Sequence, residues 1–164
     1  MFAAIDRVII WTTAIIVAVL MLAMVGSIIA GVFFRYVLND ALPWPEEFAR
    51  FAQIWVSMLG AGLVIRYGGH IAVRFIAERV SGPVRRMLDL ANTALIAVFL
   101  GLLIVFGADM SQRVERQTSP ALELSMTLPN LALPIGAGLM LYHFIVLALR
   151  REGSDRGPPR LRLE

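Results

Sequence analysis

The sequence contains no cysteine and no lysine, and only 16% of its residues are charged. Without cysteine, the chain can form no disulfide, no thiolate metal site and no cysteine nucleophile. All 15 basic residues are arginine, and the isoelectric point is near 10.2. In an apolar chain, arginines clustered in short loops are more typical of a membrane-topology signal than of a nucleic-acid-binding surface. We therefore expect no nucleic-acid partner.

Apolar residues dominate what is present. They make up 59% of the 164 residues, and the mean hydropathy is +0.75, whereas a soluble domain is roughly 45–50% apolar and about 25% charged. The chain is therefore interpreted as an integral membrane protein in contact with lipid. Each span needs about 20 mainly apolar residues to cross roughly 30 Å of hydrocarbon. We predict an all-α membrane domain over residues 1–149, with four transmembrane helices near 8–34, 45–66, 88–108 and 128–149.

The first span has no charged residue in the 27 positions from Val8 to Phe34. The apolar core of a cleaved signal peptide is only about 7–15 residues long, so we expect this segment to remain as the first transmembrane helix. Turn-forming Asn39, Asp40 and Pro43 follow in a short connection. The first and second helices are therefore expected to be antiparallel neighbours.

The second span is unusual because its uncharged run, residues 51–65, is only 15 residues long. It reaches spanning length if residues 45–50 form its first turn at the membrane interface. The proline that begins this turn suits the first position of a helix, and Glu46 and Glu47 then lie near the positive end of the helix dipole. Arg50 can pair with either glutamate, extend to lipid headgroups or contact another subunit, and these alternatives stay open.

Polar and small residues recur along the second helix at spacings of four and three, which places them on one stripe of its surface. The other positions of this helix are mainly apolar. We expect the stripe to face protein rather than lipid, because hydrocarbon offers no hydrogen bonds. We call it the polar seam, and its members are Glu46, Arg50, Gln53, Ser57, Gly60 and Val64.

Three further segments complete the predicted architecture. Residues 70–81 have apolar and charged side chains on opposite helical faces, which predicts an amphipathic interfacial helix between the second and third spans. The fourth span contains Pro134, which is expected to bend it, and Gly136, which permits close packing. The arginine-rich residues 150–164 are expected to form a disordered cytoplasmic tail.

The distribution of arginine predicts the orientation of the chain. If both termini are inside, 11 arginines lie on the inner side of the membrane and 4 on the outer side. Because positive charge is retained in the cytoplasm, we predict that both termini are cytoplasmic. Trp44, at the start of the second span, is then at the outer surface.

Few residues could support chemistry by this chain alone. It has no Gly-rich phosphate loop, HExxH zinc motif or serine nucleophile elbow, and its only histidines are His70 and His143. A haem held between these histidines would make the chain a membrane anchor of a respiratory enzyme. A small stand-alone exporter would need an ionisable residue at mid-membrane, and the spans have none at their centres. Both are alternatives to an accessory or scaffolding subunit, which the lack of an obvious proton or sodium relay favours.

Two stretches of the sequence carry a resemblance to a known family. They are RYVLNDALPWPEEFARFAQIWVSMLGAGLVIRYGGHI, residues 35–71, and TSPALELSMTLPNLALPIGAGLM, residues 118–140. Their ordered features are an arginine after the first span, Trp-x-Glu-Glu-x-x-Arg opening the second, Leu-Gly-Ala within it, Gly-His-Ile after it, and Leu-Pro-Ile-Gly in the fourth. In this order they resemble the small membrane subunit, the DctQ-like family, of tripartite ATP-independent periplasmic (TRAP) transporters.

The resemblance implies a three-part secondary transporter in the bacterial inner membrane. A periplasmic binding protein captures an organic acid, a large membrane subunit carries it with sodium by an elevator-type movement, and the small subunit braces the stationary part of the large one. By this analogy the chain is non-catalytic, holds no cofactor, and has a separate large subunit as its partner, to which sodium binds. The residues expected at the partner interface or in structural roles are Arg35, Trp44, Glu46, Glu47, Arg50, Gln53, Trp55, Ser57, Gly60, Arg66, His70, Pro134 and Gly136.

Overall fold

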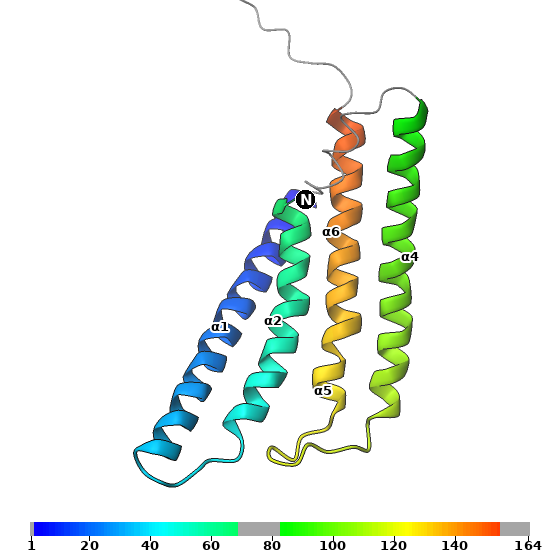
Figure 1. Cartoon of the computed structure of the whole chain (residues 1–164). Coiled ribbons are helices and arrows are strands. Elements are labelled where there is room, and N and C mark those ends of the chain that lie inside the picture. Colours follow the sequence, from blue (N-terminus) through cyan, green and yellow to red (C-terminus); the bar gives the residue numbers. More distant parts are fainter. Residues whose placement is uncertain (1, 69–82, 155–164) are drawn as a thin grey trace, which may run out of the picture.

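The computed structural model describes residues 2–68 and 83–154, and the elements in these ranges are helices (Figure 1). Four of them are long and apolar enough to cross a membrane, which confirms the predicted all-α membrane fold. The interfacial helix predicted over 70–81 and residues 155–164 of the predicted tail lie outside the described residues. The elements are α1 (Phe2–Tyr36), α2 (Pro45–Gly68), α4 (Pro83–Arg113), α5 (Thr127–Asn130) and α6 (Ala132–Ser154).

The long helices extend beyond the uncharged runs from which they were predicted. α1 begins at Phe2, before the predicted start at residue 8, and α4 covers Pro83–Arg113 rather than 88–108. α6 continues through residues 150–154, which were assigned to the tail. A span predicted from hydropathy stops at the first charged residue. The backbone hydrogen bonds of the helix do not depend on hydropathy, so the helix can continue into the membrane interface.

The fourth span is interrupted before Pro134 rather than at it. α5 ends at Asn130 and α6 begins at Ala132, so the interruption lies at Leu131. A proline has no N–H to donate to the carbonyl four residues earlier, and its ring crowds that carbonyl, which here belongs to Asn130. Leu131 itself keeps helical dihedral angles, and its carbonyl accepts the N–H of Ile135 at 3.2 Å. The change of helix therefore marks the bond that Pro134 cannot form, and a bend at Pro134 stays a prediction.

The four long helices stand in a row rather than in a closed bundle (Figure 1). α1 packs on α2, α2 on α6, and α6 on α4. α1 and α2 are antiparallel, as the short connection predicts, whereas α6 runs parallel to α2. We call the end with connections 37–44 and 114–126 the loop end, and the end where α2 and α6 finish the terminus end. Which end faces the cytoplasm stays a prediction.

α1 turns its polar residues towards α2. Asp6, Thr13 and Ser27 are buried, at separations of 7 and 14 residues that correspond to about two and four helical turns. Ser27 Oγ donates a hydrogen bond to the carbonyl of Met24 at 2.8 Å and lies 3.5 Å from the carbonyl of Pro45. The other sides of α1 are apolar and exposed. The helix therefore presents a polar stripe to protein and apolar surface to its surroundings.

Small residues allow α6 to approach both of its neighbours closely. A Cβ atom added at Gly136 would lie 2.6 Å from Met58 Cβ on α2, and one added at Gly107 on α4 would lie 2.9 Å from Pro134 Cδ. Pro134 and Gly136 therefore have structural roles at the two sides of α6. The core between α4 and α6 is formed by Leu100, Ala137 and Met140.

The close contact at Gly136 predicts that alanine is destabilising at this position but not at Gly138. Gly136→Ala should destabilise the chain by roughly 1–3 kcal/mol, because the new methyl group would overpack against the backbone of Met58. Gly138→Ala is the matched control, since a Cβ there meets nothing within 4 Å, and alanine is the better helix former by about 1 kcal/mol. Thermal unfolding in detergent would measure both, and equal stabilities would contradict the packing described.

Candidate functional site

An ion pair joins α1 and α2 at the loop end. Arg35, in the last turn of α1, donates from Nη2 to Oε1 of Glu46 in the first turn of α2, at 2.7 Å. Each charge lies near the helix end whose dipole favours it. Both side chains are about half exposed, and exposed ion pairs contribute little to stability. The pair therefore fixes the position of the Glu46 carboxylate more than it stabilises the fold.

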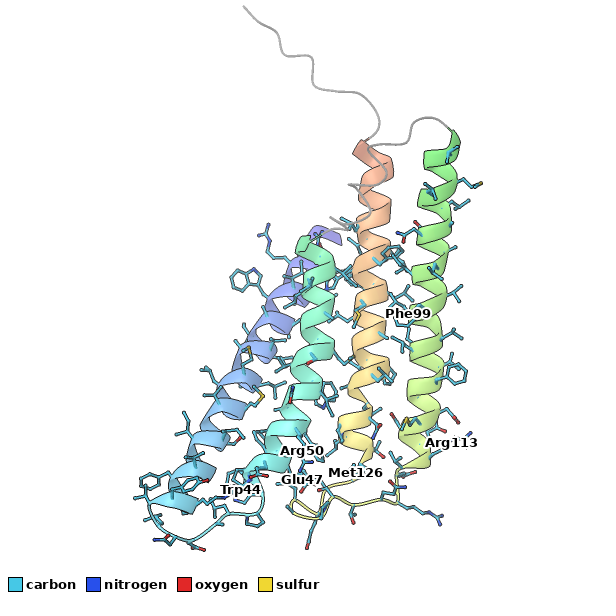
Figure 2. All side chains as sticks on the ribbon, viewed as in Figure 1. Trp44, Glu47, Arg50, Phe99, Arg113 and Met126 are labelled. Carbon is cyan, nitrogen blue, oxygen red and sulfur yellow. The ribbon has the colours of Figure 1, made fainter. Side chains whose placement is uncertain are left out.

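Glu47, the next residue, points in another direction and is only 6% exposed. Its Oε2 accepts hydrogen bonds from the backbone N–H groups of Ala121, at 2.8 Å, and Leu122, at 3.0 Å. These two residues belong to the connection between α4 and α5, which lies beside the start of α2 (Figure 2). Charge-assisted bonds of this kind are stronger than neutral ones. One carboxylate thus joins the α1–α2 pair to the other half of the chain.

The connection that Glu47 holds has ordered internal bonding. Thr118 and Ser125 form an antiparallel bridge, and buried Ser119 accepts the N–H of Leu124 on its Oγ at 3.3 Å. Glu123 has a φ of 54°, in the left-handed region that a tight turn requires. The connection is therefore a defined turn that offers two neighbouring amides to Glu47.

Arg50 has no carboxylate of its own in this corner. Glu46 is bonded to Arg35 and Glu47 to the connection, and Arg50 forms no ion pair within residues 2–68 and 83–154. Of the alternatives left open by the sequence, pairing of Arg50 with a glutamate of its own helix is therefore not formed. Its exposed side chain lies on α2 above Glu47 (Figure 2).

An open groove of about 480 Å³ lies between α1 and α2, with Arg50 in its wall. The surface of the groove is mainly apolar, and its polar residues come from α2. The lining residues are Met24, Val25, Ile28 and Ile29 of α1, and Glu46, Ala49, Arg50 and Gln53 of α2.

The polar seam is uncovered along the length of α2. Gly60 is half-buried, a Cβ there would meet nothing within 4 Å, and the other members of the seam are exposed. α2 packs on α1 and α6 with its remaining sides. The seam predicted from the sequence therefore faces outwards from this chain and does not form its core.

The two tryptophans predicted at this site have different positions. Trp44 is partly exposed just before α2 begins (Figure 2). Trp55 donates its indole N–H to the carbonyl of Leu128 at 3.2 Å and so ties α2 to α5. Trp55 therefore has a contact inside the chain, whereas Trp44 is available to the membrane interface or to a partner.

The terminus end contains a largely buried ion pair. Arg66 Nη2 at the end of α2 donates to Asp6 Oδ2 of α1 at 2.8 Å. His143 of α6 is fully buried nearby, and its ring nitrogens have no hydrogen-bond partner among the described residues. A Cβ added at Gly62 would lie 3.7 Å from the ring of His143. The other histidine considered as a haem ligand, His70, lies outside the described residues.

Two of these contacts were not predicted from the sequence. Asp6 lies before residue 8, where the first span was predicted to begin, and no partner was predicted for it or for Glu47. For Asp6 a signal was present, because antiparallel helices place the start of the first beside the end of the second, where Arg66 lies. The partners of Glu47 are backbone amides, which no residue type reveals.

Comparison with known proteins gives the family of this chain. Residues 24–152 match the family described as tripartite ATP-independent periplasmic transporters, DctQ component. The C4-dicarboxylate TRAP transporter small permease protein DctQ of Rhodobacter capsulatus is 32% identical over 109 residues, which are 65% of this chain and 48% of that protein. The sialic acid TRAP transporter small permease protein SiaQ of Vibrio cholerae is 27% identical over 128 residues, 78% of this chain and 74% of that protein.

A third relative is a longer protein. The isethionate TRAP transporter permease protein DctMQ of Oleidesulfovibrio alaskensis is 34% identical over 134 residues, which are 73% of this chain but 20% of that protein. The matched region thus spans about half of the Rhodobacter protein and a fifth of the DctMQ protein. These names favour a transporter subunit over the haem anchor and the exporter.

Four membrane-spanning helices and these relatives define a multi-pass membrane permease subunit, a transport component and not an enzyme. The chain belongs to the DctQ family of TRAP transporter small subunits.

The bonds of Glu47 predict a local response to its removal. Glu47→Ala should speed hydrogen exchange of the Ala121 and Leu122 amides more than tenfold, because each loses a charged acceptor worth roughly 1.5–3 kcal/mol. Glu46→Ala is the matched control, since its carboxylate bonds only Arg35 across the corner. Similar exchange in the two variants would show that Glu47 does not hold the connection.

Breaking the buried ion pair between Asp6 and Arg66 should destabilise the chain more than breaking the exposed pair between Asp109 and Arg113 on α4. Asp6→Ala should lower the free energy of unfolding by about 3 kcal/mol, because it leaves the Arg66 guanidinium buried without this carboxylate. Asp109→Ala, which breaks the exposed pair with Arg113, should produce no measurable change. Denaturation in mild detergent would compare them, and a stable Asp6→Ala variant would contradict the prediction.

Proposed function

We propose that this chain is the stationary brace of a TRAP transporter in the bacterial inner membrane. It holds a large membrane subunit that imports an organic acid delivered by a periplasmic binding protein. Sodium coupling and substrate binding belong to that large subunit. The names of the relatives mention C4-dicarboxylate, sialic acid and isethionate, which are all organic anions. These names support an organic acid as the substrate of the transporter.

The observation that carries this proposal is the uncovered polar seam on a row of helices. A row leaves both broad faces open, and no more than 28% of any spanning window is buried within the chain. Lipid suits most of that surface, which is apolar. It does not suit a line of arginine, glutamine and serine, which needs hydrogen-bonding groups from another protein. The seam is thus suited to docking rather than to substrate passage.

The longer relative supports a large partner of the same kind. The region that resembles this chain is about a fifth of the DctMQ permease protein. Where one protein joins two parts in a single chain, the parts are held together by their interface as well as by the connection. We therefore infer that this chain binds a separate large permease through an equivalent interface.

The seam predicts which substitution blocks assembly. Gly60→Leu should lower the amount of large subunit that co-purifies with the tagged chain roughly tenfold, because the added side chain points into the docking face and overpacks it. Gly101→Leu on α4 is the matched control, since its Cβ also meets nothing within 4 Å.

Gentle extraction followed by affinity purification and mass determination would measure both variants. A wild-type chain that emerges alone or as a homodimer contradicts the proposed function. Equal loss in the two glycine variants contradicts the assignment of the docking face to α2.

A further inference from the structure

We propose that Arg50 is the ionic contact of this chain with the large subunit, and that its guanidinium pairs in the α1–α2 groove with a carboxylate of that subunit. This inference rests on the proposed function and adds to it the chemical group that the partner must supply. It follows from the pairing of the charged side chains at the loop end.

The described carboxylates near the groove form no ion pair with Arg50. Arg35, Glu46 and Arg50 lie together, and the Arg35 guanidinium bonds the Glu46 carboxylate at 2.7 Å. Glu47 would be the next acceptor, but its carboxylate bonds two backbone amides and is buried. Within the described residues, no other acidic side chain lines the groove. Arg50 is therefore the basic group at the groove that forms no ion pair within the described residues.

The position of Arg50 makes a missing counter-charge unfavourable. Arg50 lies inside the spanning segment Pro45–Arg66, more than one turn from its start. Charged side chains in such segments are costly unless they reach water, headgroups or an opposite charge. The planar guanidinium matches a carboxylate in two parallel hydrogen bonds, and it stays charged at any physiological pH. A carboxylate matches this geometry, and so does a phosphate.

Two features favour a protein carboxylate over a lipid phosphate. Gln53 and Ser57 continue the exposed line from Arg50 towards the centre of the span, about one and two turns farther along. A lipid headgroup could pair with Arg50, but its acyl chains offer no hydrogen bonds to the next two residues. Gly60 then leaves room for the backbone of another helix to approach. A helix with an acidic residue near its outer end matches the whole line.

The first experiment compares charge variants in the assembled transporter. Arg50→Glu should reduce the large subunit recovered with the tagged chain about tenfold or more, because two carboxylates would then face each other. Arg50→Lys should retain most of it, and Arg50→Gln should lie between. Arg113→Glu is the matched control, because Arg113 is an exposed arginine of the loop end on α4, which has Asp109 as its partner. Circular dichroism of each purified chain checks that the helices remain folded.

The second experiment identifies the facing group. Because the chain has no cysteine, single cysteines at Gln53 or Ser57 can be crosslinked to single cysteines placed along the helices of the large subunit. An Asp or Glu→Arg substitution on the crosslinked helix should then restore recovery with Arg50→Glu. Restoration confirms the pair, and failure of every acidic position on that helix overturns it.

The outcomes separate this inference from the proposed function. If Gly60→Leu blocks assembly while Arg50→Glu assembles normally, the docking face stands and the ionic contact is wrong. If Arg50→Glu leaves the complex intact and removes only co-purified anionic phospholipid, the counter-ion is lipid, and the inference also fails. If the wild-type chain recovers no large subunit, the proposed function itself fails.

Discussion

Every polar group placed in hydrocarbon must find its partner within protein, and this constraint organises the whole chain. It accounts for the buried pair of Asp6 and Arg66, for the Trp55 indole bonded to Leu128, and for the Glu47 carboxylate bonded to backbone amides. The same constraint draws attention to polar side chains that face outwards from the chain. Three residues of the polar seam, Arg50, Gln53 and Ser57, are exposed on α2, and we propose that another protein covers them.

The row of helices is consistent with the proposed role as the brace of a larger subunit. A closed bundle would turn its polar residues inwards and leave only apolar surface outside. Among the described helices, α1 packs closely on α2 alone, and α2 keeps one side open between its contacts with α1 and α6. A largely buried ion pair holds the terminus end of the α1–α2 interface, and close glycine contacts hold both sides of α6. Such a row is suited to cover an extended surface.

The sequence predicted the four spans, the antiparallel first pair and the stripe on the second helix, because hydropathy and helical periodicity are local properties. It did not predict that α6 would lie between α2 and α4, since helix order depends on contacts such as Gly136 with Met58. It also left the partner of Arg50 open. Two glutamates lie within one turn of Arg50, and only the fold shows that Arg35 and a distant connection have engaged them.

The bond between Glu47 and the connection has a consequence for biogenesis. The two amides that donate to Glu47 lie 74 and 75 residues after it, so α2 is synthesised before these donors exist. Until then the Glu47 carboxylate must be hydrated, which the start of a span at the membrane surface allows and its centre would not. The position of Glu47 in the first turn of α2 therefore also allows α2 to insert into the membrane. The two hydrogen bonds can form only after residues 121 and 122 have been synthesised.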